Sequence, residues 1–492
     1  MISDFTNSYL RLPEAFFERV TPTPLPAPEL VAFNPAALGL LDLPLEVVEA
    51  PAFVEAFAGN RPLPGAEPVA MCYAGHQFGH YVPRLGDGRA ILLGEATNRR
   101  GDRWEVQLKG AGRTPFSRDG DGRAVLRSTI REYLCSEAMH GLGIPTTRAM
   151  CIVGGREEVY REQIETAAVL TRLAPTHVRF GTFEYFYHAG DYRALWELAN
   201  WLLAHHFQQV AGYRNPYHEL LREIVVSTAR LIARWQLVGF AHGVMNTDNL
   251  SVLGLTLDYG PFGFLDRYQP DFICNHSDYQ GRYAFDQQPR IALWNLSCLA
   301  QAMLPLLHPE DGEAAAALAN EALAEFESAF MATYVRGARE KLGLMREDRG
   351  DPRLFAGLLR LLAEQQVDYT RFFRALGRFS SRDEAPERSE AAAEFADPAA
   401  FAVWAASYRE RLRAENSDDA LRRRAMDQVN PKYILRNYLA EQAIESARGG
   451  DFREIERLRA LLARPFDEQP EREDYAARPP AWAGRIEVSC SS

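Results

Sequence analysis

The side chains with the clearest chemical potential stand in two neighbouring segments, HGVMNTDN at residues 242–249 and DYG at residues 258–260. Enzymes that transfer phosphoryl groups from ATP use a loop after a long helix to supply a base and a metal-binding Asn, and a D-[FY]-G segment to hold Mg²⁺ on the phosphates. The same residue types follow here in the same order, which predicts that Asn249 and Asp258 are metal ligands. A DYG alone is usually a turn, so this prediction depends on the whole set.

The base in this set departs from the usual pattern. In protein kinases the catalytic Asp stands five residues before the metal-binding Asn, and Val244 occupies that position here. Asp248 immediately precedes Asn249, and we expect it to act as the proton acceptor instead. The alternative is that Asp248 only forms an Asx turn that caps the loop.

The scarcity of lysine marks a second functional candidate. Only Lys109, Lys341 and Lys432 are lysines among the 55 basic residues, so a lone Lys in the first 340 residues indicates a site that requires a compact ammonium group. With Glu132 on a predicted helix, Lys109 reproduces the ion pair between a strand lysine and a helix glutamate that positions nucleotide phosphates. The alternative is a surface salt bridge worth about 0–1 kcal/mol.

Glycine-rich and arginine-bearing segments could bind phosphates. GDGR at residues 86–89 and DGR at residues 121–123 would let the backbone approach a phosphate closely. Arg172 and Arg179 flank an Ala-Pro pair, and guanidinium groups match phosphate oxygens in geometry. The residue types leave the alternatives open, because such glycines are often simple turns and either arginine could lie on the surface.

The strand pattern explains how Lys109 would be presented. Apolar and polar side chains alternate in WEVQLK, residues 104–109, so Lys109 should point to the face opposite the core. Before it, we expect a β-hairpin over residues 82–93 with its tip at residues 86–88. A further strand is expected over residues 167–173.

Helical periodicity dominates the rest of the chain. Glu132 lies in a predicted helix over residues 124–140, which Gly141 and Gly143 should end. Further helices are expected over residues 191–210, 217–238, 289–307, 313–341, 351–376 and 430–448.

This order, a smaller β-rich half before a larger α-rich half, predicts an α+β fold with the two lobes of a protein kinase. The expected division is residues 1–68 as an irregular Pro-rich lead-in that wraps the N-lobe, 69–175 as a β-rich N-lobe, 176–380 as an α-rich C-lobe, and 381–492 as a linker, C-terminal helices and a Cys-bearing tail.

Composition indicates which kinds of partner and which cellular compartment to expect. The chain has 492 residues, 47% hydrophobic and 25% charged, which are ordinary values for a globular protein. A net charge of −11 without a basic stripe argues against nucleic acid. The N-terminus does not resemble a signal peptide, and no run approaches the roughly 18 apolar residues of a membrane span. We therefore expect a cytoplasmic protein without membrane contact.

The cysteine pattern argues against structural zinc and against a disulfide framework. The six cysteines, Cys72, Cys135, Cys151, Cys274, Cys298 and Cys490, include no C-x-x-C pair. Most are expected to be buried thiols. Cys490 differs because it stands in a short polar tail at the end of the chain, where packing does not explain it.

Three long segments carry the most specific patterns in the chain. They are YAGHQFGHYVPRLGDGRAILLGE at residues 73–95, VQLKGAGRTPFSRDGDGRAVLRSTIREYLCSEAMHGLGIPTTR at residues 106–148, and NHSDYQGRY at residues 275–283. Together with the loop HGVMNTDN and the DYGPFGF segment, they resemble the selenoprotein O family. The similarity runs over most of the chain and is weakest in residues 382–416. Members of this family are pseudokinases that bind ATP in a flipped orientation and transfer AMP to Ser, Thr or Tyr hydroxyls of proteins.

The resemblance implies roles that residue types alone do not give. It makes Asn249 and Asp258 the ligands of Mg²⁺ or Mn²⁺ and Asp248 the proton acceptor. The flipped nucleotide and the AMP chemistry come only from the resemblance. A bacterial relative is described as a UMP transferase that uses manganese, so UTP is an alternative to ATP. The implied nucleotide contacts are Gly86, Gly88, Arg89, Lys109, Asp121, Gly122, Arg172, Arg179 and Asp258.

Three classes of activity follow: an AMP or UMP transferase, a γ-phosphate kinase, and a silent ATP-binding scaffold. Val244 at the position of the kinase base argues against the kinase, and the complete set of Lys109, Asn249 and Asp258 argues against the scaffold. Many family members end in Cys-x-Ser, and Cys490 begins such a sequence here. The resemblance supports a labile disulfide from Cys490 to Cys274 that restricts substrate access, and the alternative is two independent thiols.

Overall fold

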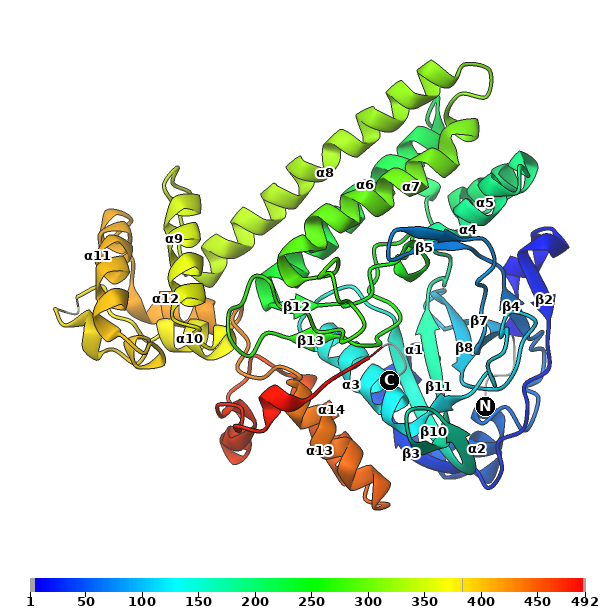
Figure 1. Cartoon of the computed structure of the whole chain (residues 1–492), viewed down its shortest axis with the longest axis horizontal. Coiled ribbons are helices and arrows are strands. Elements are labelled where there is room, and N and C mark those ends of the chain that lie inside the picture. Colours follow the sequence, from blue (N-terminus) through cyan, green and yellow to red (C-terminus); the bar gives the residue numbers. More distant parts are fainter. Residues whose placement is uncertain (1–4, 383, 490–492) are drawn as a thin grey trace.

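The computed structural model of the chain describes residues 5–382 and 384–489. It is a mixed α and β structure, in which an antiparallel sheet lies at one end and long helices extend away from it (Figure 1). The α+β class predicted from the sequence is therefore confirmed.

A nine-stranded antiparallel sheet forms the first part of the described chain. Its strands follow the order β2-β4-β7-β8-β11-β10-β3, with β1 paired to β7 and β9 paired to β11. The strands are β1 Phe5–Thr6, β2 Phe17–Arg19, β3 Glu29–Phe33, β4 Val69–Met71, β7 Ala90–Thr97, β8 Arg103–Lys109, β9 Ala124–Val125, β10 Arg148–Tyr160 and β11 Ile164–Ala174. Two small two-stranded sheets pair β5 Gly75–Gln77 with β6 His80–Val82, and β12 Phe240–Ala241 with β13 Gly263–Phe264.

The expected hairpin around residues 86–88 is wrong. Strand β6 pairs with β5, and β7 instead forms a hairpin with β8. The segment at residues 86–88 is a loop, in which the amides of Gly86 and Asp87 donate to the carbonyls of Tyr73 and Met71. The glycines at residues 86–88 predicted a reversal there, but the chain reverses at residues 78–79 and 98–102 instead, so each strand pairs with its other neighbour in the chain.

The N-terminal segment is more regular than expected. Strand β2 pairs with β4 near one edge of the sheet, and β3 pairs with β10 at the other edge. Two helices also lie in this segment, α1 Pro35–Leu40 and α2 Pro51–Phe57. Their apolar side chains pack under the sheet beside Val106 and Leu108 of β8.

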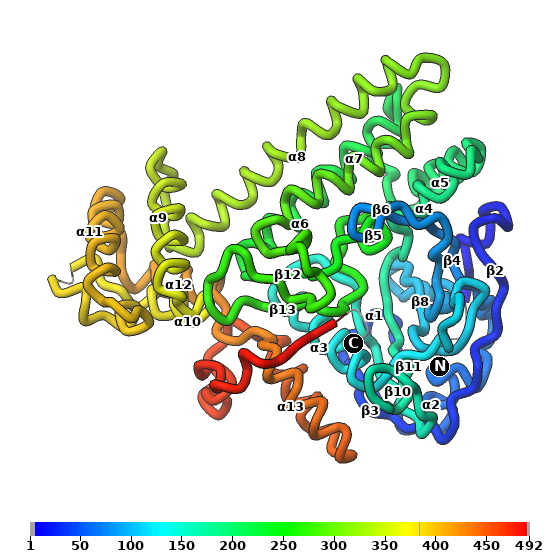
Figure 2. The backbone as a smooth tube through the Cα atoms, in the orientation of Figure 1, coloured from blue at the N-terminus to red at the C-terminus, as the bar shows by residue number. Residues whose placement is uncertain are grey.

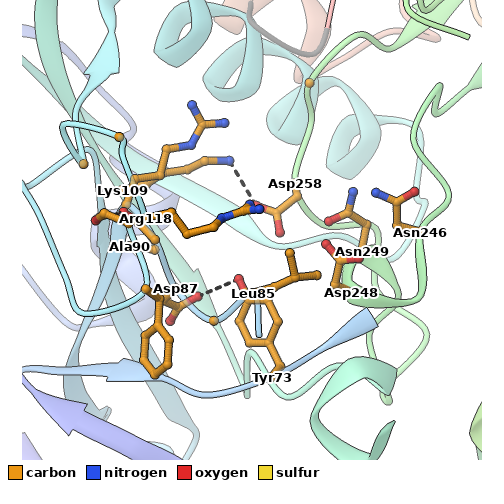
Figure 3. Close-up of a pocket in the computed structure, with 18 of the residues that line it drawn as sticks. Tyr73, Leu85, Asp87, Ala90, Lys109, Arg118, Asn246, Asp248, Asn249 and Asp258 are labelled. Carbon is orange, nitrogen blue, oxygen red and sulfur yellow. Dashed lines mark hydrogen bonds and ion pairs between the residues drawn. The ribbon is translucent and has the colours of Figure 1, made fainter. Parts of the chain in front are cut away.

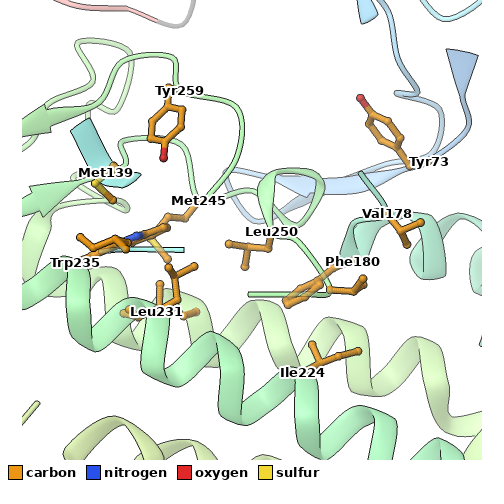
Figure 4. Packing of buried hydrophobic residues seen from close by; sticks show 14 of the residues in the cluster. Tyr73, Met139, Val178, Phe180, Ile224, Leu231, Trp235, Met245, Leu250 and Tyr259 are labelled. Atoms are coloured by element: carbon orange, nitrogen blue, oxygen red, sulfur yellow. The ribbon is translucent and has the colours of Figure 1, made fainter. Parts of the chain in front are cut away.

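Helices build the remainder of the described chain. They are α3 Leu126–Gly141, α4 Phe180–His188, α5 Tyr192–His205, α6 Pro216–Val238, α7 Gln288–Leu307, α8 Gly312–Lys341, α9 Asp351–Glu364, α10 Tyr369–Leu376, α11 Pro398–Ala414, α12 Asp419–Asp427, α13 Asn437–Arg448 and α14 Arg453–Leu462. Helix α6 begins after its Asn215 cap and ends at Gly239, whose φ of 72° places it in the left-handed region. Apolar residues of α6, including Ile224, Leu231 and Trp235, pack beneath Met245 and Leu250 (Figure 4).

Two predicted helices and the expected linker differ from the structure. The expected helix over residues 351–376 is two helices, because Gln366 takes a positive φ of 49° and Asp368 caps the start of α10. The expected helix over residues 430–448 begins only at Asn437. The expected linker near residue 390 is packed rather than exposed, since Ala392 and Phe395 are buried. The pattern also missed α11, α12 and α14.

One helical segment has the length and apolar character of a membrane span, contrary to the sequence-based expectation. It covers Phe285–Leu307. More than half of it is buried inside the protein, and α7 packs against α4, α6 and α8. Its apolar side chains, among them Leu296 and Met303, belong to the main core. Burial in this core accounts for its composition.

The end of the described chain returns to the sheet-bearing part (Figure 2). The amide of His276 donates to the carbonyl of Val488 at 2.8 Å. The hydroxyl of Ser489 donates to Glu162, between β10 and β11, at 3.2 Å. The tail therefore bridges the loop around residue 276 and the sheet.

Candidate active site

A cavity of about 550 Å³ lies between the strands that carry Lys109 and the loop over residues 244–261. Most of its wall is polar, and cationic and acidic side chains face one another across it (Figure 3). The predicted site residues on its wall are Gly86, Gly88, Arg89, Lys109, Asp121, Gly122, Arg172, Arg179, Asp248, Asn249 and Asp258.

Lys109 ends strand β8 and points into the cavity, as the alternation in this strand predicted. Its Nζ lies 2.6 Å from Glu132 Oε2 on α3 and 3.0 Å from Asp258 Oδ1. Glu132 lies behind the cavity wall and is 4% exposed. The predicted pair between a strand lysine and a helix glutamate is therefore present, and it is buried rather than a surface salt bridge.

Two arginines join the lysine on the same carboxylate. Arg172 of β11 contacts both Glu132, at 3.0 Å, and Asp258. Arg179, just before α4, lies 2.8 Å from Asp258 Oδ2. Both guanidinium groups are 2% exposed, so neither is a surface arginine.

Asp258 is held under unusual constraints. Lys109, Arg172 and Arg179 oppose the cost of burying this carboxylate and hold its pKa well below the usual range. Its backbone has a positive φ of 58°, a conformation that costs a non-glycine residue energy and is often found at functional sites. The fold therefore favours the ionised form of this carboxylate on the wall of the cavity.

Asp248 has a different environment. Its carboxylate lies on the backbone of Gly75, where an added Cβ would meet Oδ1 at 2.6 Å. Gln77 Nε2 donates to Oδ2 at 3.3 Å, while buried Oδ1 has no hydrogen-bond partner among the described residues. Burial raises the pKa of Asp248 to about 7. A carboxylate with this pKa is matched to accepting a proton near neutral pH.

Asn249, on the same loop as Asp248, is the second predicted metal ligand. Its Nδ2 donates to the carbonyl of Val244 at 3.0 Å, which leaves the amide oxygen to bind a cation. With the carboxylate of Asp258, this gives oxygen donors from two positions of one cavity. Oxygen donors are the ligands that Mg²⁺ and Mn²⁺ prefer. The residues present thus fit a hard divalent cation.

The glycine loops approach the cavity as the sequence suggested. Gly86 has a φ of 61°, and a Cβ there would lie 2.3 Å from the Phe116 ring. Gly122 has a φ of 71°, and a Cβ would lie 2.1 Å from the carbonyl oxygen of Gly112. Both positions therefore require glycine. Asp121 is held by Arg161, with contacts of 2.7 and 2.8 Å.

Several wall residues were not predicted. Asp87 is buried and accepts hydrogen bonds from the Met71 amide, the Tyr73 hydroxyl and Gln107. Arg118 and Arg161 add positive charge. Asp87 lies between two glycines that were singled out, so its position in that loop was the available signal. The two arginines gave none, because many arginines occur along the chain.

The predicted redox pair is only half described. Cys490 lies outside the described residues. Cys274 is buried, and its sulfur would be 2.7 Å from a Cβ on Gly243. It therefore packs directly against the loop that carries Asp248.

Three cations converge on Asp258 in a cavity that also holds Asn249 and Asp248, and this combination is typical of enzymes that handle nucleotide phosphates. A sequence model described as "Protein adenylyltransferase SelO" matches residues 1–463. The chain belongs to this family of nucleotidyltransferases, which confirms the resemblance seen in its motifs.

Relatives along the full length support this assignment. Proteins named "Protein nucleotidyltransferase YdiU" are 60% identical in Thioalkalivibrio sulfidiphilus and 56% identical in Myxococcus xanthus, each over 99% of this chain and 98% of the relative. The protein of that name in Pseudomonas aeruginosa is 50% identical over 99% of both chains.

Proposed function

We propose that the chain transfers AMP from ATP to Ser, Thr or Tyr hydroxyls of proteins and releases pyrophosphate. The observation that carries this proposal is the difference in environment between two carboxylates in one cavity. Asp258 is ionised and surrounded by cations, whereas Asp248 is buried with a pKa of about 7. Such a difference suits one carboxylate to metal binding and the other to proton transfer.

A protein-kinase-like arrangement of two lobes is part of the proposal. The strand lysine pairs with a helix glutamate, and the long helix α6 leads into the loop that carries Asn249 and then to Asp258. These elements occur in the order found in kinases. Val244 stands where the kinase base would be, so Asp248 takes that role here.

The proposed reaction is a single displacement at the α-phosphorus. The acceptor oxygen forms a bond to phosphorus, the bond to the β-phosphate oxygen breaks, and the hydroxyl proton passes to Asp248. Lys109, Arg172 and Arg179 stabilise the negative charge that grows on the phosphate oxygens. Asn249 and Asp258 would hold Mg²⁺ or Mn²⁺, which neutralises phosphate charge when bound.

The remaining nucleotide contacts follow from their places on the cavity wall. Gly86 and Gly88 would let the backbone approach the nucleotide, and Arg89 adds a cation beside them. Asp121 and Gly122 would border its other side.

Labelled ATP distinguishes the possible activities. A protein substrate is incubated with the enzyme and ATP labelled at either the α- or the γ-phosphate. We expect label in protein from the α position only. Transfer from the γ position would establish a kinase, and tight ATP binding without transfer would establish a scaffold.

UTP with Mn²⁺ is the second candidate. The similar proteins carry the name "nucleotidyltransferase", which does not specify the nucleobase of the nucleotide. Parallel reactions with α-labelled ATP and UTP, each with Mg²⁺ or Mn²⁺, measure the preference directly. Higher kcat/KM for UTP would replace AMP by UMP in the proposal.

Redox control is a further part of the proposal. Cys274 packs on Gly243, and Asn275 Nδ2 donates to the Gly243 carbonyl at 3.0 Å, so changes at Cys274 would reach the catalytic loop. Val488, two residues before Cys490 in the sequence, accepts a hydrogen bond from the His276 amide. Peptide mapping of oxidised protein should give a linked peptide with Cys274 and Cys490, and Cys490→Ala should abolish the effect of reductant on transfer. Absence of that peptide would refute the proposed disulfide between Cys274 and Cys490.

A further inference from the structure

Outside the cavity wall, His76, Glu184 and Cys298 bring three metal-binding side chains together. One ligand atom from each lies within 4.8 Å of the other two. His76 Nδ1 is 2.8 Å from Glu184 Oε1. None of the three lines the cavity that holds Asp258.

Rigid elements hold this cluster. His76 lies on β5, Glu184 on α4 and Cys298 on α7, and α4 packs against both β5 and α7 (Figure 1). The His76 ring is packed by Tyr81 and Trp294, each with ring centroids 5.3 Å away. Ligands held by packing on helices and strands lose little freedom when they bind a metal.

Glu184 also has the outer hydrogen bond expected of a metal-binding carboxylate. Its Oε2 accepts a hydrogen bond from the Thr247 hydroxyl, and Thr247 in turn accepts from the His76 amide at 2.7 Å. Such outer partners orient ligands at metal sites. Because Oε2 is held by Thr247, Oε1 is the oxygen that faces His76.

The donor set selects the class of metal. One imidazole nitrogen, one carboxylate oxygen and one thiolate suit Zn²⁺ and similar borderline ions rather than Mg²⁺. Water can complete a four-coordinate shell, as at zinc sites with three protein ligands. The proposed catalytic ligands Asn249 and Asp258 offer only oxygen and fit a harder cation.

We propose that His76, Glu184 and Cys298 form a binding site for Zn²⁺, separate from the catalytic cation. Binding replaces the hydrogen bond between His76 and Glu184 by two metal bonds, which moves the Nδ1 proton of His76 to Nε2, and it releases the thiol proton of Cys298 to solvent. The metal joins β5, α4 and α7 beside Thr247, which is the neighbour of Asp248 in the chain. The proposal does not depend on which group the enzyme transfers.

Cobalt serves as a spectroscopic probe of this site. Reduced full-length protein is titrated with Co²⁺ and followed by absorption, because a cobalt–thiolate bond gives a charge-transfer band that oxygen ligands do not. We expect one equivalent of Co²⁺ to give this band and equimolar Zn²⁺ to remove it. A large excess of Mg²⁺ should leave it unchanged.

Variants locate the ligands. Cys298→Ser should abolish the band, whereas Cys151→Ala, a buried cysteine of the sheet, should keep it. His76→Ala and Glu184→Gln should each weaken Co²⁺ binding about tenfold or more. Circular dichroism of each variant verifies folding. A band that persists in Cys298→Ser, or its absence from folded wild-type protein, would overturn the site. Because no transfer is measured, this result is independent of the proposed reaction.

Discussion

Asp248 and Asp258 are connected through a single nitrogen of Arg179. Its Nη1 lies 2.8 Å from the carbonyl oxygen of Asp248 and 2.8 Å from Oδ2 of Asp258. The guanidinium also lies over the Tyr73 ring, at 4.5 Å from the centroid. The loop that carries the proposed base and the residue that would bind metal are therefore held in one fixed relationship.

Asp258→Asn tests the proposed metal ligand. The substitution keeps the shape of the side chain but removes the charge that Lys109, Arg172 and Arg179 neutralise. We expect loss of metal-dependent nucleotide binding in calorimetry and loss of transfer. Leaving those cations without their carboxylate should also lower stability by about 3–5 kcal/mol. Wild-type metal dependence in this variant would contradict the assignment.

Asp248→Asn separates binding from chemistry. The amide keeps the shape of the side chain but cannot accept the hydroxyl proton. We expect unchanged nucleotide affinity and a kcat lower by about 10²- to 10⁴-fold, the usual contribution of a general base. Equal losses of nucleotide affinity in Asp248→Asn and Asp258→Asn would refute the division of roles.

The rate should depend on pH through Asp248. Because its pKa is raised to about 7 by burial, the base is protonated below pH 7 and ionised above it. We expect kcat to rise with pH up to about 7 and then to level off. A flat profile between about pH 5.5 and about pH 8.5, a range that brackets this pKa, would argue against Asp248 as the base.

The same raised pKa affects stability with the opposite sign. Between the unfolded pKa and about 7, the folded protein binds more protons at Asp248 than the unfolded chain does. Its contribution to stability is therefore present at low pH and is lost as pH rises through 7. The difference in melting temperature between Asp248→Asn and wild type should therefore increase in favour of the variant from about pH 5 to about pH 8. Equal differences at both pH values would contradict this.

Lys109→Arg tests whether a compact ammonium is required. The lysine fits between Glu132 and Asp258 at 2.6 and 3.0 Å, and its side chain is 11% exposed. A planar guanidinium cannot occupy this space without displacing one partner. We expect kcat/KM to fall at least about tenfold. Lys432→Arg, which replaces a lysine paired with Glu468 and Glu473, is the matched control and should retain activity.

Lys341 offers a prediction about stability alone. Its Nζ lies 4.1 Å from the centroid of the Phe373 ring, and burial lowers its pKa to about 7. A lowered lysine pKa makes the folded state less stable at pH values where the unfolded lysine is charged. Lys341→Met should raise the free energy of unfolding by about 1–3 kcal/mol at neutral pH. Denaturant unfolding measures this change, and a loss of stability would show that the charge is needed.

Local patterns in the sequence were sufficient for several features. The alternation over residues 104–109 placed Lys109 opposite Val106 and Leu108, and the structure confirms it. The long helix before the loop at residues 242–249 was also predicted within one residue. These features depend on side-chain periodicity and caps within a few residues, which a single sequence contains.

Tertiary structure decided the features that depend on distant segments. Residues 17–19 and 29–33 join the sheet because strand pairing satisfies backbone groups of segments far apart in the chain. The sequence left Arg172 and Arg179 as either phosphate ligands or surface residues, and only folding buried them against Asp258. The high pKa of Asp248 likewise comes from burial, to which the backbone of Gly75 contributes from more than a hundred residues away. Residue types alone determined which groups could do chemistry, whereas burial and the neighbours that fold against them determined their charge.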